Sequence, residues 1–204
     1  MISIQPGMAA DAAALEALLD LAFGPERHKK TVYRLRAGVS QIEGLWFVAR
    51  AGEALVGSVQ YWPVRIAPED GGAALPAVLL GPIAIAPALR GLGIGQALIE
   101  TSLAVAASLG HVQVLLVGDE PYYSRMGFSA RATLGLSLPG PYDPRRLLAR
   151  QIALGPALPA AGAVLAAFPV PGEAEKPKQQ PQRRPRRQQG PLAHPHDPAR
   201  VVGL

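Results

Sequence analysis

Apolar positions along the chain follow two periods, one typical of helices and one typical of strands. An apolar face spaced i, i+3, i+4, i+7 and i+8 predicts a helix after Asp11, which can cap it. The residues of that face are Leu15, Leu18, Leu19, Ala22 and Phe23. A more polar helix is predicted over residues 26–36. Residues 93–109 are apolar around much of a helical circumference, which predicts a third helix lying under a sheet.

Strands are predicted where apolar and β-branched residues form short runs between turn residues. The predicted strands cover residues 2–5, 46–50, 55–66, 78–85, 112–117, 128–138 and 163–168. Short helices are predicted at 121–126, where proline occupies the first turn, and at 143–151, where Asp143 is the cap. The resulting order is β-α-α-β-β-β-α-β-α-β followed by an appendage. It predicts an α/β fold with a mixed sheet covered by helices.

The C-terminal segment differs in composition from the rest of the chain. Residues 172–204 are rich in Pro, Gln and Arg and hold almost no large apolar side chains. Such a segment buries too little surface to offset the entropy lost on ordering, so we expect a disordered tail. We therefore expect one domain over residues 1–171, with a C-terminal extension at 139–171, and a basic tail over 172–204.

Charge and composition narrow the classes of function. Residues 171–204 hold seven Lys or Arg against three Asp or Glu, so the tail carries most of the net charge of +5. Nucleic acid is accordingly expected as no more than a weak partner of the tail. The chain has no cysteine, which excludes disulfides and thiolate chemistry and fits a cytoplasmic location. Prolines interrupt both long uncharged stretches, residues 71–89 and 151–172, so no membrane span is predicted.

Two motifs carry candidate chemistry. The first is the loop Arg90-Gly91-Leu92-Gly93-Ile94-Gly95, whose glycines allow a tight turn and close approach of a ligand. Because this loop opens the predicted helix at 93–109, free N–H groups and the helix dipole favour an anion such as a pyrophosphate. The second motif, Tyr122-Tyr123-Ser124-Arg125-Met126-Gly127-Phe128, follows the strand at 112–117. Taken singly, each is also explained by local structure: a glycine-rich helix start and ordinary core packing.

Together, in this order and separation, the two motifs resemble those of the GNAT superfamily of N-acetyltransferases. The loop matches the acetyl-CoA signature Q/R-x-x-G-x-G/A, and Tyr123-x-x-x-Gly127-Phe128 matches Y-x-x-x-G-F. The resemblance covers about residues 2–138. It implies a twisted mixed sheet in which one strand pair is splayed to admit CoA. Gly81-Pro82 is the expected place of the bulge that splays it, because proline cannot donate to a strand ladder.

The resemblance also implies a reaction: a primary amine attacks the thioester of acetyl-CoA directly, without a metal. Two of the four histidines, His194 and His196, form an H-P-H pair that makes a poor metal site. Tyr123 would be the general acid for the leaving thiolate, with Tyr122 as the alternative. The residues implied to hold acetyl-CoA are Ile83, Ala84 and Ile85 at the pantetheine and thioester, and Arg90, Gly91, Leu92, Gly93, Ile94 and Gly95 at the pyrophosphate. Glu26, His28 and Glu120 are candidate general bases, none of them preferred.

The sequence leaves several alternatives open. A non-catalytic acyl-CoA-binding sensor or scaffold would carry the same motifs, and the basic tail could itself be functional as a nucleic-acid tether. The amine acceptor is either a small molecule or a peptide or protein, and homodimers are common in the family. The acceptor is expected to be set by the segments 23–36, 63–77 and 137–171. Within the last of these, residues 139–144 are expected to close one side of the acceptor cleft.

Overall fold

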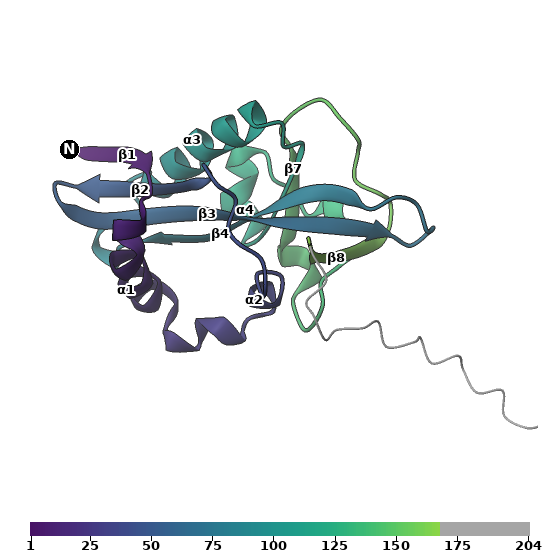
Figure 1. The fold of residues 1–204 in the computed structure, drawn as a ribbon, viewed down its shortest axis with the longest axis horizontal. Helices are drawn as coiled ribbons and strands as arrows, with labels where there is room; N and C mark the ends of the chain where they lie inside the picture. Colours follow the sequence, from purple (N-terminus) through teal and green to yellow (C-terminus); the bar gives the residue numbers. More distant parts are fainter. Residues whose placement is uncertain (168–204) are drawn as a thin grey trace, which may run out of the picture. The chain divides into compact units, whose positions relative to one another are not determined.

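A computed structural model describes residues 1–167, in which a mixed sheet carries helices on both faces (Figure 1). The main path of the sheet runs β1-β2-β3-β4-β5-β7, and β6 and β8 pair beside it. The strands are β1 (Ile2–Pro6), β2 (Trp46–Ala51), β3 (Ala54–Pro68), β4 (Leu75–Ile85), β5 (Gln113–Val117), β6 (Leu136–Ser137), β7 (Leu147–Gln151) and β8 (Gly162–Ala166). Along the main path only β4 and β5 are parallel neighbours. The tail predicted at 172–204 lies outside the described residues.

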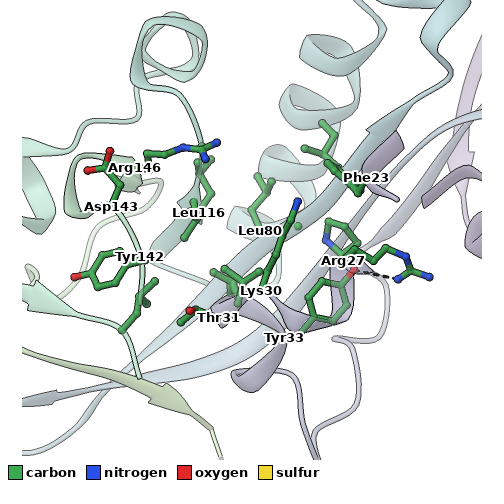
Figure 2. A pocket seen from close by; sticks show the side chains of 18 of the residues that line it. Phe23, Arg27, Lys30, Thr31, Tyr33, Leu80, Leu116, Tyr142, Asp143 and Arg146 are labelled. Carbon is green, nitrogen blue, oxygen red and sulfur yellow. Dashed lines mark hydrogen bonds between the residues drawn. The ribbon is translucent and has the colours of Figure 1, made fainter. Parts of the chain in front are cut away.

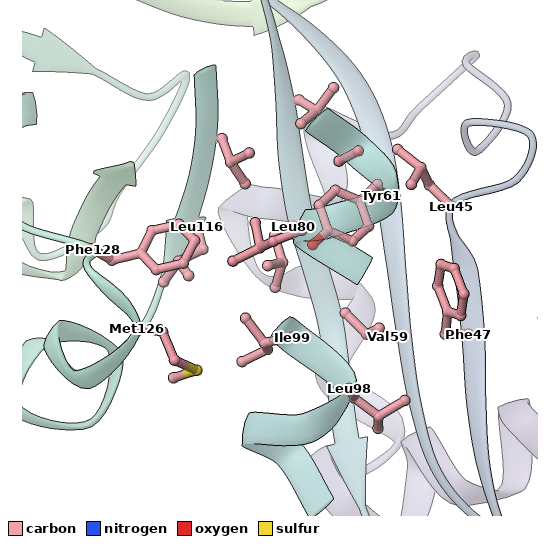
Figure 3. Close-up of a cluster of buried hydrophobic side chains, with 14 of the residues drawn as sticks. Leu45, Phe47, Val59, Tyr61, Leu80, Leu98, Ile99, Leu116, Met126 and Phe128 are labelled. Carbon is pink, nitrogen blue, oxygen red and sulfur yellow. The ribbon is translucent and has the colours of Figure 1, made fainter. Parts of the chain in front are cut away.

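The helices cover opposite faces of the sheet. Helix α3 (Ile94–Ser108) lies on one face, while α1 (Ala12–Phe23) and α2 (Thr31–Arg34) lie on the other (Figure 1). Leu98 and Ile99 of α3 are fully buried against strand residues such as Val59 and Tyr61 (Figure 3). The mixed α/β class and the helix that begins after Gly93 are therefore confirmed.

Ile99→Val is expected to lower the free energy of unfolding by about 1 kcal/mol, because it removes one buried methylene from a site that is 0% exposed. Ile2→Val, at a residue that is 40% exposed, is the matched control and should change it by less than about 0.5 kcal/mol. Urea unfolding of both variants measures the difference. Equal effects would mean that the interface between α3 and the sheet is not packed as described.

The first polar segment differs from its prediction. Residues 26–36 form a 3-10 helix η2 (Pro25–Lys29) and the short α2, because Lys30 between them is extended, with φ −69° and ψ 143°. The two halves are held by different parts of the fold. The Arg27 guanidinium of η2 is paired with two carboxylates of α1, whereas the Thr31 hydroxyl of α2 donates to the Pro141 carbonyl.

Two predictions at the start of the chain are also wrong in detail. Asp11 precedes α1, but its side chain makes no capping bond to that helix. It accepts the Met8 backbone N–H at 3.0 Å and pairs with Arg50 instead. The face of α1 is buried at its three leucines, whereas Phe23 at its end is 40% exposed and lines a cavity.

The segment after Phe128 is the least well predicted part. The strand expected at 128–138 is reduced to a bridge at Ser129, a turn of 3-10 helix and the two-residue β6. The helix expected at 143–151 is instead a 3-10 turn η6 (Pro144–Arg146) followed by β7. β7 pairs antiparallel with β5 along all five of its residues, so it covers the edge of β5 that faces away from β4. Asp143 does cap, since it accepts the Arg145 backbone N–H at 3.0 Å.

Candidate functional site

The parallel strands β4 and β5 part soon after they meet. They pair only at Val78 with Val114 and at Leu79 with Leu115. The next residue of each strand, Leu80 and Leu116, lines a cavity of about 510 Å³ (Figure 2). Beyond the paired residues, no strand of the described part of the chain lies on this side of β4. Its free edge can therefore pair with an extended ligand through backbone N–H and C=O groups.

A bulge in β4 lies where the strands part. The register between β3 and β4 shifts between Val59 and Tyr61, so Gly81 and Pro82 have no paired partner. Gly81 has φ +127°, a conformation that side chains rarely adopt, and Pro82 has no N–H to donate. The bulge predicted at Gly81-Pro82 is confirmed.

Two walls enclose the cavity from segments far apart in the sequence (Figure 2). One wall comes from the end of α1, from η2 and from α2; the other comes from the loop before β7. The labelled side chains are Phe23, Arg27, Lys30, Thr31 and Tyr33 on the first wall and Tyr142, Asp143 and Arg146 on the second. Thr31 donates to the Pro141 carbonyl and Arg34 to the Pro139 carbonyl, which fastens the walls together. Segment 139–144 thus closes one side of the cavity.

Tyr123 reaches the cavity from α4 (Glu120–Tyr123). Its ring crosses Gly118 so closely that a Cβ there would lie 2.1 Å from the Tyr123 Cε2 atom. The ring also makes edge contacts with Tyr122 and Phe128, at centroid distances of 4.9 and 6.2 Å. The pKa of Tyr123 is raised to about 12, mainly by burial and in smaller part by Tyr122 and Asp119, while Arg146 opposes the rise. The phenol therefore keeps its proton at neutral pH and can donate a hydrogen bond.

The glycine loop lies outside this cavity, where residues 90–93 are exposed just before the N-terminus of α3. Gly91 and Gly93 have φ of +80° and +77°, left-handed conformations that favour glycine. No side chain caps α3, and no ion pair in residues 1–167 involves Arg90. Tyr122 links the loop to Tyr123, since its hydroxyl lies 2.8 Å from the place of a Cβ on Gly95.

The three predicted strand residues alternate between the two faces of β4. Ile83 and Ile85 both pack against the core under α3, and Ile83 also lines the cavity. Ala84 faces the other side, against the leucines of α1. Only the backbone of this stretch follows the free edge of β4, which suits a ligand held by main-chain groups.

None of the three candidate bases reaches the cavity. Glu26 pairs with Lys29, and His28 packs edge-on against Tyr33 at 4.9 Å. Glu120 is structural, since it accepts the Ser129 hydroxyl at 3.0 Å and the Ala130 N–H at 2.9 Å.

The acidic residues that do line the cavity, Asp119 and Asp143, were not singled out from the sequence as site residues. Asp119 is paired with Arg146 at 3.2 Å. The Arg145 guanidinium donates to the carboxylate of Asp143 and lowers its pKa.

A row of side chains on the first wall was not predicted from the sequence. Every third residue from 27 to 36 lines the cavity: Arg27, Lys30, Tyr33 and Arg36. These residues do not belong to one helix: Arg27 lies in η2, Lys30 is extended, Tyr33 lies in α2 and Arg36 follows it. A polar helix over residues 26–36 is all that the sequence predicted here, and a break at Lys30 has no local signal in it.

Within residues 1–167, no cluster of three or more potential metal ligands occurs. In the same range, no helix is both long enough and apolar enough to cross a membrane.

Comparisons with known proteins agree with this geometry. The model of the acetyltransferase (GNAT) family matches residues 12–128. The Escherichia coli K12 protein YhbS, described as an uncharacterized N-acetyltransferase, is 31% identical over 122 residues, which are 60% of this chain and 70% of YhbS. The crystal structure of E. coli YhbS in complex with CoA superposes with a TM-score of 0.65 at 27% identity, covering 81% of this chain and 89% of that one. A GNAT family acetyltransferase from Brucella melitensis, in complex with acetyl-CoA, gives 0.59 at 27% identity, covering 81% and 95%.

Proposed function

Because the chain belongs to the acetyltransferase (GNAT) family, we propose that it transfers an acetyl group from acetyl-CoA to a primary amine. The observation that carries the proposal is the parting of β4 and β5 at the Gly81-Pro82 bulge, which leaves a free strand edge beside Tyr123. That the similar YhbS and Brucella proteins bind CoA and acetyl-CoA supports the choice of donor.

The residues present fit this donor. Backbone groups of Ile83, Ala84 and Ile85 would pair with the pantetheine arm, as a sheet edge pairs with any extended chain. The loop Arg90-Gly91-Leu92-Gly93-Ile94-Gly95 would hold the pyrophosphate with the free N–H groups of α3 and the charge of Arg90. The exposure of residues 90–93 and the absence of a side-chain cap on α3 support this assignment.

The chemistry needs little more than these elements. A backbone N–H of the free β4 edge donates to the oxygen that gains charge as the amine attacks the thioester. The Tyr123 phenol donates its proton or a hydrogen bond to the departing sulfur. Both carboxylates that line the cavity are paired with arginines, which makes them poor general bases. We therefore infer that the amine loses its proton to solvent. The two walls orient the amine and shield the thioester from water.

Calorimetric titration of acetyl-CoA into the full chain tests the donor site. An Arg90→Ala, Gly93→Val double variant is expected to bind at least about 30-fold more weakly, since it removes one phosphate-facing charge and strains a left-handed position. Arg131→Ala, which removes an exposed arginine from another loop, is the control and should bind like the wild type. Equal binding by the double variant would refute the assignment of the loop.

A turnover measurement distinguishes the proposed transferase from a non-catalytic acyl-CoA-binding protein. Release of free thiol from acetyl-CoA is measured against a library of primary amines. Release with at least one amine supports the transferase. Saturable binding with no release for any amine would instead support a non-catalytic acyl-CoA sensor, and no binding at high micromolar acetyl-CoA would overturn both. We place this activity in a domain of residues 1–171 and, given the absence of cysteine, in the cytoplasm.

A further inference from the structure

Arg36 is the arginine of the cavity lining that has no acidic partner in the described part of the chain. The other two, Arg27 and Arg146, are paired with carboxylates. The Arg36 guanidinium stacks instead between aromatic rings, 4.6 Å from the centroid of Tyr33 and 5.6 Å from that of Trp62. Aromatic faces attract a cation but accept no strong hydrogen bonds from it.

Two buried N–H donors, on side chains that contact each other, are left without an acceptor. Neither the buried Nε of Arg36 nor the buried indole N–H of Trp62 has a hydrogen-bond partner within residues 1–167. Buried polar groups in folded proteins are nearly always paired, and an unpaired one is costly. Arg36 lines the cavity, whereas Trp62 does not, so the unpaired Arg36 donor indicates that a ligand with acceptor oxygens completes its surroundings.

The charge of Arg36 is also held in an unfavourable place. The pKa of Arg36 is lowered to about 10, chiefly by burial and slightly by the like charge of Arg27, while the Tyr33 phenol opposes the fall. The guanidinium is still charged at neutral pH. A half-buried cation without a counter-ion is expected at a site that binds an anion, where the bound state repays the desolvation.

The position of this cation is beside the expected reaction centre. Arg36 Nη2 lies 3.5 Å from the place of a Cβ on Gly81, in the bulge where β4 leaves β5. The neighbouring lining is largely apolar, with Leu79, Leu80, Pro82 and Leu138. A complementary group therefore combines apolar atoms with one negative charge.

We propose that Arg36 binds a carboxylate of the substrate, and that the acceptor is an amine that carries one, such as an amino acid. This inference rests on the proposed function. A planar guanidinium matches a carboxylate with two parallel hydrogen bonds and neutralises its single charge. The same chemistry could come from the acyl donor, if the acyl group were a dicarboxylic one, and the experiment separates these two sources.

The acceptor arm compares amines that differ only in the carboxylate: leucine with 3-methylbutylamine, and phenylalanine with 2-phenylethylamine, each with acetyl-CoA. Wild-type kcat/KM is expected to favour the amino acid of each pair by about 10- to 100-fold, the range for a hydrogen-bonded charge pair. Arg36→Met should abolish the preference, Arg36→Lys should keep part of it, and Arg131→Met should keep all of it.

The donor arm compares succinyl-CoA with acetyl-CoA for the same amines. A preference for succinyl-CoA that Arg36→Met abolishes would support the proposed contact and assign the carboxylate to the acyl group. The absence of a preference in both arms, or a preference that survives in Arg36→Met, would overturn the proposal.

Binding measured by calorimetry tests the role of Arg36 independently of catalysis, and it also detects a variant that fails to fold. In the presence of CoA, leucine is expected to bind the wild type at least about tenfold more tightly than 3-methylbutylamine does. The Arg36→Met variant is expected to bind the two amines with equal affinity. An unchanged melting temperature and CoA affinity show that the variant is folded. Acetyl transfer without any carboxylate preference would refute only the role of Arg36. A carboxylate preference in binding, with no thiol release for any amine, would refute only the transferase.

Discussion

Tyr123→Phe is expected to lower kcat for acetyl transfer by about 10²- to 10⁴-fold while leaving the affinity for acetyl-CoA within about twofold of the wild type. The substitution removes only the hydroxyl, so the edge contacts of the ring with Tyr122 and Phe128 remain. What is lost is the donor to the departing sulfur. Thiol release with the fastest amine of the library gives kcat, and calorimetry gives the affinity.

The pH dependence of the wild type follows from the same hydroxyl. Burial raises the pKa of Tyr123 to about 12, so its acid form is complete at neutral pH and is lost only as the pH rises through that value. Burial raises the pKa of a thiol at the same place for the same reason, which keeps donor and leaving group matched. We therefore expect no loss of kcat between pH 7 and pH 10 that depends on Tyr123.

Tyr122→Phe is the matched control for this prediction. Tyr122 does not line the cavity, and its hydroxyl lies over Gly95 at the start of α3. Its loss should weaken acetyl-CoA binding more than it lowers kcat. The opposite pattern, a large fall of kcat for Tyr122→Phe and little change for Tyr123→Phe, would assign the general acid to Tyr122.

The donor half of the site could be predicted from the sequence because its determinants are local. A left-handed turn before a helix requires glycine, and Gly91 and Gly93 adopt that conformation. A proline inside an apolar strand disturbs its ladder, and the register of β4 shifts at Gly81-Pro82. Each of these features depends on a few consecutive residues, so a short motif is enough to locate it.

The other half depends on contacts between distant segments and could not be predicted in the same way. Residues 147–151 are a strand because β5 has an edge to be paired, although their local pattern favoured a helix. Tertiary contacts likewise decide whether an arginine of the first wall is paired with a carboxylate. Arg27 meets two carboxylates of α1, and Arg36, nine residues later, meets the faces of Tyr33 and Trp62. Both line the same cavity, and nothing in the sequence near either arginine shows which of them is paired.

Gly118→Ala is expected to lower kcat by at least about 10²-fold, although Gly118 has no side chain to take part in the reaction. A methyl group there would lie 2.1 Å from Cε2 and 2.7 Å from Cδ2 of Tyr123, far inside van der Waals contact. The aromatic ring is rigid and confined by Tyr122 and Phe128, so it must rotate away as a unit and take its hydroxyl out of the cavity. Geometry at a reacting centre tolerates little displacement.

A double-mutant cycle distinguishes this displacement from general damage to the fold. If Gly118→Ala acts by moving the Tyr123 hydroxyl, kcat of the Gly118→Ala, Tyr123→Phe double variant should be within about threefold of that of the less active single variant. Gly72→Ala is the control for adding a methyl group elsewhere; its nearest neighbour is the flexible Asp70 carboxylate, and kcat should not change. Multiplicative losses in the double variant would show that Gly118 contributes independently of Tyr123. Wild-type kcat in Gly118→Ala would show that the position of the Tyr123 ring does not control transfer.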